Sequence, residues 1–218
     1  MQVIHRNVCF AVTVVITLVA CQESTQNLAQ REPATHLPAD TCNNPDAHIL
    51  CCYEYIPETL TSTMKIAGDR EHGEKLRITG TIYKADGKTP YPDVVLYVYQ
   101  TDDNGYYSKA GNEKGFQKWH GRLHGWCKTD ARGFYEIRTI RPARYPDNSM
   151  PANIHAAIKK PDTNQSYYVS DFVFKDDSLV NASYLKTITS LVGGTGILDV
   201  RKLPDSTWVG KRDIILTK

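Results

Sequence analysis

The chain has 218 residues, of which 41% are hydrophobic and 23% are charged, and this composition is typical of a globular protein with one domain, or one domain and a tail. The formal net charge is only +2, and lysine and arginine are interspersed with aspartate and glutamate. Because a nucleic-acid footprint needs clustered positive charge, we predict no nucleic-acid partner.

The first twenty residues differ from the rest of the chain. Residues 9–20 (CFAVTVVITLVA) form a continuous apolar run with the length of a signal-peptide core, too short to cross a membrane comfortably. The run ends at LVAC, residues 18–21, which resembles the bacterial lipoprotein box, in which the cysteine is lipidated. This predicts a signal peptide over residues 1–20 and export to the bacterial periplasm or cell surface, with membrane contact only through a lipid anchor at Cys21. An ordinary secretory signal with a coincidental cysteine is the alternative.

Residues 22–40 are polar and show no periodicity. They predict a flexible stalk that gives the domain reach from its anchor. The remaining residues, 41–218, are predicted to form the folded domain.

The cysteines of this domain are Cys42, Cys51, Cys52 and Cys127. An even number in an exported protein favours one or two disulfides. Cys51 and Cys52 are adjacent, and we do not expect them to pair with each other, because a bridge between neighbours distorts the peptide. We therefore expect one of them to pair with Cys42.

Strand patterns begin after residue 75. Apolar and polar residues alternate, or β-branched and aromatic residues dominate, in residues 76–84, 94–100, 134–140, 153–160 and 166–174. We interpret the first two segments as a strand pair around a Gly- and Pro-containing turn. Residues 120–130 and 134–140 are interpreted as a hairpin around the turn DARG.

The other segments are less regular. Residues 58–65 read as a short helical or irregular lead-in, and residues 176–191 as one short helix. The last strands are expected within residues 197–203 and 208–216. Eight or so short strands without βαβ alternation predict an all-β fold: an antiparallel β-sandwich with long loops carrying the site and at most one or two short helices.

Four motifs follow one another between residues 76 and 158: GYY at 105–107, TDARGFYEIRTIRP at 129–142, PARYP at 142–146 and NIH at 153–155. In this order the chain resembles the intradiol ring-cleavage dioxygenases, the catechol and protocatechuate family. That resemblance implies a ferric ion, Fe(III), held by two tyrosinates and two histidines. The matching positions are Tyr107, Tyr145, Asn153 and His155, so an asparagine stands where the first histidine is expected.

The resemblance breaks at two positions. Asn153 is a neutral and weaker donor than imidazole, which puts iron affinity in doubt unless another side chain takes its place. His120 and His124 lie in the loop between the two tyrosines and are candidates for a substitute ligand. Many family members have arginine where this chain has Met150, so a charge near the substrate is missing.

The implied activity is oxidative cleavage of a catechol-type aromatic diol by O2, with Tyr107 or Tyr145 leaving the metal and acting as internal base. Arg122, Arg141 and Arg144 could steer an acidic substrate, although pairing with surface carboxylates is the commoner role. Two other functions stay open: a non-catalytic, lipid-anchored β-sandwich binding protein derived from the family, and a transthyretin-like structural domain. In the last case the two tyrosines and His155 would point apart.

Overall fold

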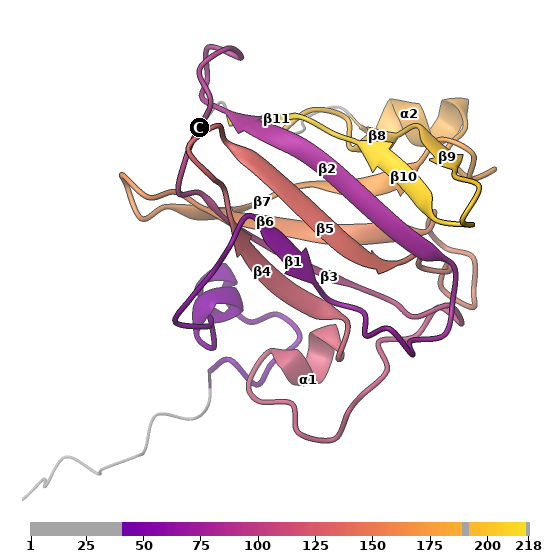
Figure 1. The fold of residues 1–218 in the computed structure, drawn as a ribbon. Coiled ribbons are helices and arrows are strands. Elements are labelled where there is room, and N and C mark those ends of the chain that lie inside the picture. Colours follow the sequence, from indigo (N-terminus) through magenta and orange to yellow (C-terminus); the bar gives the residue numbers. More distant parts are fainter. Residues whose placement is uncertain (1–40, 189–191, 217–218) are drawn as a thin grey trace, which may run out of the picture. The chain divides into compact units, whose positions relative to one another are not determined.

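The computed structural model describes residues 41–188 and 192–216, which form two packed β-sheets (Figure 1). The predicted signal peptide, the anchor at Cys21 and the stalk lie outside the described residues. The strands are β1 (Thr63–Lys65), β2 (Lys75–Tyr83), β3 (Val95–Gln100), β4 (His124–Lys128), β5 (Phe134–Ile140), β6 (Asn153–Lys159), β7 (Ser166–Phe174), β8 (Ile197–Leu198), β9 (Val200–Lys202), β10 (Trp208–Lys211) and β11 (Ile214–Ile215). The helical segments are the 3-10 helix η1 (Ile49–Tyr53) and the short helices α1 (Gln117–His120) and α2 (Ala182–Thr187).

One sheet has the strand order β1-β5-β2-β10-β9, with β11 added on β2, and the other has the order β4-β3-β6-β7-β8. The prediction of an all-β sandwich with few short helices is confirmed. Its pairing is mixed, because the long pairs β2–β5, β3–β6 and β6–β7 are antiparallel whereas β1, β8, β10 and β11 each join a neighbour in parallel. These four strands are short, and each lies far in sequence from its parallel partner, so the chain between them is long enough for a parallel crossover.

Both predicted strand pairs are wrong, although the strands themselves exist. β2 and β3 lie in different sheets, and so do β4 and β5. The turn before β5 forms, with the Gly133 amide donating to the Asp130 carbonyl at 2.8 Å, but it carries the chain from one sheet to the other. Alternation reports which face of a strand is buried; it does not report which strand lies beside it.

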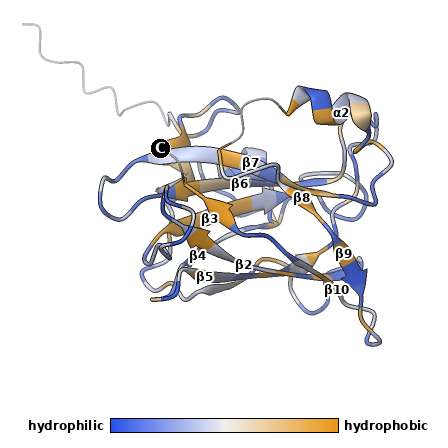
Figure 2. Ribbon diagram, turned by 90° about the horizontal axis from the view of Figure 1, so that it is seen from above, coloured by the Kyte–Doolittle hydropathy of each residue, from blue (hydrophilic) through white to orange (hydrophobic). Residues whose placement is uncertain are grey.

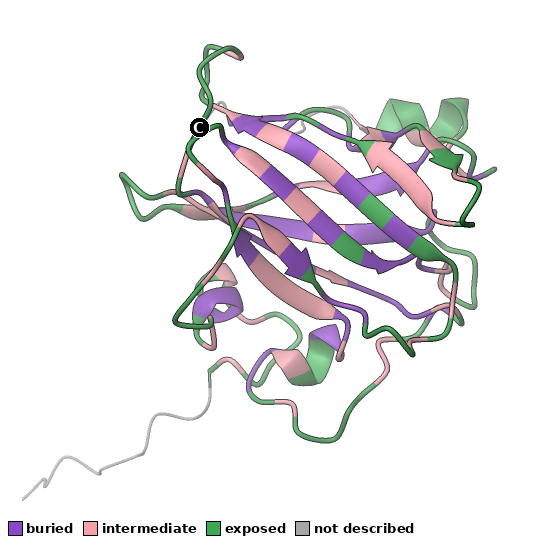
Figure 3. Ribbon diagram, viewed as in Figure 1, coloured by how far each residue is buried: buried purple, intermediate pink, exposed green. Residues whose placement is uncertain are grey.

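The main core lies between the sheets. Every second residue of β2 is buried, as the banding in Figure 3 shows, and β6 sends Ile154, Ala156 and Ile158 to the same interior. Figure 2 shows the hydrophobic colour on β3, β4 and β6. Each isoleucine buried there contributes about 1.5–3 kcal/mol to folding, so this face fixes the sandwich.

A second cluster covers the outer face of the β4-β3-β6-β7-β8 sheet. Tyr97 and Ala157 of the sheet pack with Phe116, which precedes α1, and with Cys52 and Tyr53 of η1. The loop between β3 and β4 and the segment around η1 thus form a third layer. This layer bounds the candidate site.

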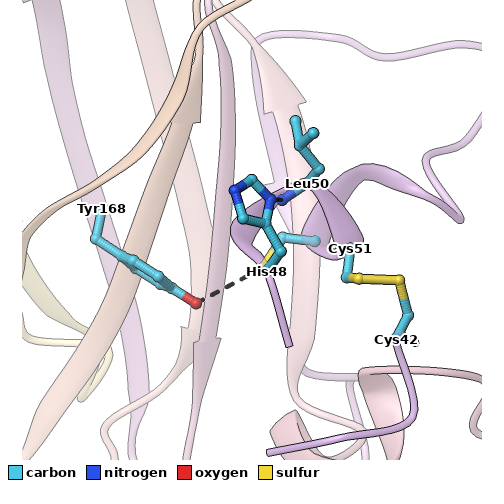
Figure 4. The surroundings of a disulfide bond; sticks show 6 residues. Cys42, His48, Leu50, Cys51 and Tyr168 are labelled. Carbon is cyan, nitrogen blue, oxygen red and sulfur yellow. Dashed lines mark hydrogen bonds between the residues drawn. A yellow bond between two sulfur atoms is a disulfide. The ribbon is translucent and has the colours of Figure 1, made fainter. Parts of the chain in front are cut away.

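The disulfide joins Cys42 to Cys51, as expected for a pair formed by Cys42 and one of the two adjacent cysteines. Cys52 and Cys127 are buried free thiols. The Tyr168 hydroxyl lies 3.9 Å from the Cys52 sulfur, and Figure 4 shows Tyr168 pointing toward this segment. The bridge therefore ties the start of the domain to the layer over the outer face.

Three elements, η1, β1 and α1, were not predicted, and one expected helix is present. β1 lies in the segment interpreted as a lead-in, where its three residues are too few to show a period. α1 lies in the long loop before β4. The helix expected in residues 176–191 is α2. No helix within residues 41–188 and 192–216 is long and apolar enough to cross a membrane.

Candidate metal centre

The candidate site lies on the outer face of the β4-β3-β6-β7-β8 sheet. His155 is on β6, directly opposite Tyr99 of β3, and the two rings stack with centroids 4.6 Å apart. Because side chains alternate along a strand, His155 and Asn153 face outward between the core residues of β6. Two loops bring the tyrosines to this face.

The loop after β3 carries Tyr107. The Asp102 carboxylate accepts hydrogen bonds from the backbone amides of Asn104 and Tyr106, at 2.9 and 3.1 Å, and so closes a tight turn. Gly105 in this turn has a φ of 84°, and a Cβ there would overlap the carbonyl oxygen of Arg144. Glycine is thus required where the loop touches the next one, which explains the GYY pattern physically.

The loop between β5 and β6 carries Tyr145. It is held against the first loop by two hydrogen bonds: the Thr101 hydroxyl donates to the Ala143 carbonyl at 2.8 Å, and the Ala143 amide donates to the Asp102 carbonyl at 3.0 Å. A turn then follows, in which the Asn148 amide donates to the Tyr145 carbonyl at 2.8 Å. The contact between the loops brings Tyr145 to Tyr107.

Three predicted ligands converge. The hydroxyl oxygens of Tyr107 and Tyr145 are 2.6 Å apart, and Nε2 of His155 lies 2.9 Å from the first and 3.2 Å from the second. The transthyretin-like alternative required these side chains to point apart, which they do not. Burial, and then the hydrogen bond with Tyr145, raise the pKa of Tyr107. Without a cation beside it, this phenol is held protonated.

Asn153 is buried beside the triangle. Its amide nitrogen donates to the Asp171 carboxylate of β7 at 2.9 Å and lies 3.3 Å from Nε2 of His155. The same carboxylate oxygen lies 3.0 Å from Nδ1 of His155. The asparagine thus contacts a carboxylate that the sequence did not single out.

The two candidate substitute ligands have other partners. His120 is buried, its Nδ1 lies 2.8 Å from the Tyr97 hydroxyl, and its ring stacks on Tyr99 with centroids 3.6 Å apart. Burial lowers the pKa of His120 to about 3, so the ring is neutral. Nδ1 of His124 donates to the Gly121 carbonyl at 2.6 Å. Neither ring has a hydrogen bond with the tyrosine pair among the described contacts.

The structure also places Met150 and the three arginines that were considered for binding an acidic substrate. Met150 is exposed. The three arginines considered for an acidic substrate each pair with a carboxylate, as their commoner role predicts: Arg122 with Glu71, Arg141 with Asp176 and Arg144 with Asp177.

Asp171 and Tyr99 are two site residues that the sequence motifs do not mark. Tyr99 reads as an ordinary strand aromatic, and nothing in the sequence marks it. A faint signal exists for Asp171, because Ser170 and Asp171 place two polar residues side by side where β7 should alternate.

Comparisons with known proteins identify the family and the fold. The family model Dioxygenase_C, described as "Dioxygenase", matches residues 53–196, more than half of the chain. The catechol 1,2-dioxygenase of Acinetobacter baylyi is 32% identical over 92 residues, which are 41% of this chain and 28% of that protein. The matched segment therefore spans well under two thirds of the curated relative.

Solved structures share the fold. The dioxygenase domain of a dioxygenase carbohydrate-binding protein fusion from Streptomyces sp. SirexAA-E superposes with a TM-score of 0.54 at 20% identity, covering 74% of this chain and 92% of that one. The catechol 1,2-dioxygenase from Acinetobacter sp. ADP1 superposes with a TM-score of 0.52 at 20% identity, covering 75% of this chain and 60% of that one. An intradiol ring-cleavage dioxygenase from Tetranychus urticae superposes with a TM-score of 0.51 at 18% identity, covering 74% of this chain and 89% of that one. Because the family model matches more than half of the chain and the motifs occur in the family's order, the chain belongs to the intradiol ring-cleavage dioxygenase family.

Proposed function

We propose that this protein binds ferric iron through Tyr107, Tyr145 and His155 and cleaves a catechol-type aromatic diol with O2 between the two hydroxylated carbons. The observation that carries the proposal is the triangle of two phenol oxygens and one imidazole nitrogen, with sides of 2.6, 2.9 and 3.2 Å. Tyr107 lies on one loop, 38 residues before Tyr145 on the next, and His155 lies on the strand that follows, so packing alone would not require their polar atoms to meet.

The donor set fits iron in the ferric state. Phenolate oxygens are hard and anionic, and imidazole nitrogen also suits iron. The phenols lie close enough to share one proton, so loss of a proton from the pair leaves a negative charge that a trivalent cation would balance. Bound iron would supply Lewis acidity and a template on which a diol and O2 meet.

The protein's own contribution is to hold and move protons. With iron bound, the oxygen of Tyr107 or Tyr145 would be a phenolate that could accept a proton from a diol hydroxyl, and the neighbouring tyrosine oxygen, 2.6 Å away, would offer that proton a second partner. The Tyr99 ring stacks on His155 and lies 5.9 Å from the Tyr107 ring, centroid to centroid, which limits the motion of both. All three arginines considered for an acidic substrate are already paired with carboxylates, which favours an uncharged diol over an acidic one.

The test is turnover of catechol by the iron-loaded chain. We expect a muconate-type diacid to form with one O2 consumed for each diol, and we expect Tyr145→Phe to lower the rate by at least about 100-fold, the scale of losing a positioned acid–base group. Tyr106→Phe is the matched control, because Tyr106 adjoins Tyr107 but is exposed. Absence of ring cleavage by an iron-loaded wild-type chain would contradict the proposal.

A second candidate function is a non-catalytic binding protein that retains the family fold. The observation in its favour is Asn153, whose amide nitrogen donates to Asp171 where the family pattern expects a ligand imidazole. Asn153→His separates the two functions. A rise in ferric affinity from near zero supports a decayed site, whereas iron binding by the wild-type chain that changes little supports a working one.

We also propose that the protein is exported and anchored through lipid on Cys21. The Cys42–Cys51 disulfide supports an oxidising compartment, since cytosolic thiols stay reduced. Mass spectrometry of the mature N-terminus should find acyl chains on Cys21, and Cys21→Ser should release the protein from the membrane fraction. An unmodified N-terminus at another residue would overturn the anchor.

A further inference from the structure

β7 is irregular opposite His155. Ile154 pairs with Phe172 and Ala156 pairs with Val169, so Ser170 and Asp171 together oppose the single residue His155. This is the two-against-one arrangement of a β-bulge, which re-aims side chains and is common beside functional sites. It lets Val169 and Phe172 both reach the core while Asp171 faces the site.

Residues that follow β7 in the chain, Val192, Gly196 and Arg212, hold the backbone of the bulge. The Ser170 carbonyl accepts a hydrogen bond from the buried Arg212 at 2.8 Å, and the Ser170 amide donates to the Val192 carbonyl at 3.0 Å. Gly196 packs on the Asp171 backbone so closely that a Cβ would overlap the Asp171 carbonyl oxygen. Both backbone groups of Ser170 therefore have hydrogen-bond partners, and the close packing of Gly196 fixes the backbone of Asp171.

The Asp171 carboxylate has two donors. One oxygen lies 3.0 Å from Nδ1 of His155 and accepts the Asn153 amide at 2.9 Å. An ionised carboxylate can only accept, so Nδ1 carries the proton, and in the neutral imidazole Nε2 then presents its lone pair. Nε2 is the atom that faces both phenols.

We infer that Asp171 is a positioning residue for the metal centre, orienting His155 through Nδ1 while Asn153 holds the Asp171 carboxylate. The identity of the metal rests on the proposed function, but the chain Asn153–Asp171–His155 does not. Asn153 then has a role of its own beside His155. The carboxylate also makes the imidazole a stronger donor, which offsets part of what the missing histidine would have supplied.

A direct ligand role for Asp171 fits the contacts less well. Its oxygen meets His155 at Nδ1, whereas the phenols meet the ring at Nε2. Metal-binding histidines commonly donate their second ring nitrogen to a carboxylate in this way, and such partners change metal affinity by about 10- to 100-fold.

The first experiment needs no metal. In the iron-free, ¹⁵N-labelled chain, the side-chain ¹⁵N shifts of His155, identified by their loss in His155→Gln, should report one tautomer with the proton on Nδ1. Asp171→Ala should give a mixture of tautomers. Asp176→Ala is the matched control, because Asp176 pairs with Arg141 instead, and should match the wild type.

If Asp171→Ala does not fold, Asn153→Ala measured in the same way should shift the tautomers in the same direction, by less. Retention of the Nδ1–H tautomer in the folded variants would overturn the inference.

The second experiment uses ferric iron alone as the probe. Asp171→Asn should weaken ferric binding by about 10- to 100-fold, while Asp176→Asn should leave it unchanged. Equal affinities for Asp171→Asn and wild type would also overturn the inference. If the wild-type chain binds no iron, the proposed function fails, and the tautomer measurement still decides the role of Asp171.

Discussion

The two faces of the β4-β3-β6-β7-β8 sheet are built on different principles, although β6 contributes to both. Toward the other sheet it sends Ile154, Ala156 and Ile158, which are fully buried among apolar neighbours. Toward the loops it sends Asn153 and His155, whose polar atoms form hydrogen bonds with groups on other segments, while the His155 ring also stacks on Tyr99. Volume and apolarity therefore determine the inner face. On the outer face apolar packing holds the covering layer, whereas loop geometry and one strand irregularity place the polar groups of the site.

Substituting two adjacent residues of β6 that lie on opposite faces, Ile154 and His155, tests this difference with the largest expected effect. Ile154→Ala should lower the free energy of unfolding by about 2–5 kcal/mol, because it leaves a cavity in the core. His155→Gln should lower it by about 1 kcal/mol or less, since it exchanges one polar partner for another, but should abolish stoichiometric iron binding. Urea denaturation and metal analysis measure the two effects. Equal losses of stability in both variants would contradict the contrast.

A second change tests whether loop contact governs the outer face. Gly105→Ala should cost about 1–3 kcal/mol in backbone strain and should weaken iron binding, because the new methyl group forces the Tyr107 loop off the Arg144 carbonyl. Gly111→Ala is a matched control: Gly111 also has a positive φ, of 95°, but nothing lies within 4 Å of its Cβ position. Calorimetry and iron titration separate strain from misplacement of the site. Equal iron affinities in the two variants would show that loop contact does not control the site.

A smaller effect should appear in the pH dependence of stability. The pKa of His120 is lowered to about 3 by burial under the outer layer, from 6.5. The unfolded chain therefore gains a proton at this residue as pH falls below 6.5 while the folded chain does not, and stability is lost from there down to about pH 3.

Between pH 6 and pH 5 this loss should amount to about 1 kcal/mol in the iron-free chain. His120→Gln keeps a partner for the Tyr97 hydroxyl and should remove that part of the slope in urea denaturation at several pH values. A wild-type slope that His120→Gln leaves unchanged would contradict the assignment.

Much of the fold was predictable from local pattern. β5 and β7 have the predicted limits because their alternation or β-branched content is continuous. The pairing of β2 with β5 was not predictable, because every inward-facing strand presents a similar apolar row. The last strands were expected within residues 197–203 and 208–216, and β8 to β11 lie there. The limits and parallel pairing of β8 and β11 were not predictable, because each has only two residues.

The site was predictable to the extent that motifs encode it. Tyr107, Tyr145 and His155 stand at positions that the family resemblance marks, and the structure brings them together. Asp171 was not predictable, because its approach to His155 depends on an irregularity that only the paired strands reveal. Asn153 was read as a missing ligand, since its contact with Asp171 joins residues 18 apart in the chain.

The central claim is that Tyr107, Tyr145 and His155 together form one ferric site. Metal analysis and visible absorption of the chain purified with ferric iron test it most directly. We expect one iron per chain and a visible tyrosinate-to-iron band, with the band altered in Tyr107→Phe and in Tyr145→Phe. Iron that is substoichiometric and colourless in the wild-type chain, or a band that neither variant changes, would contradict it.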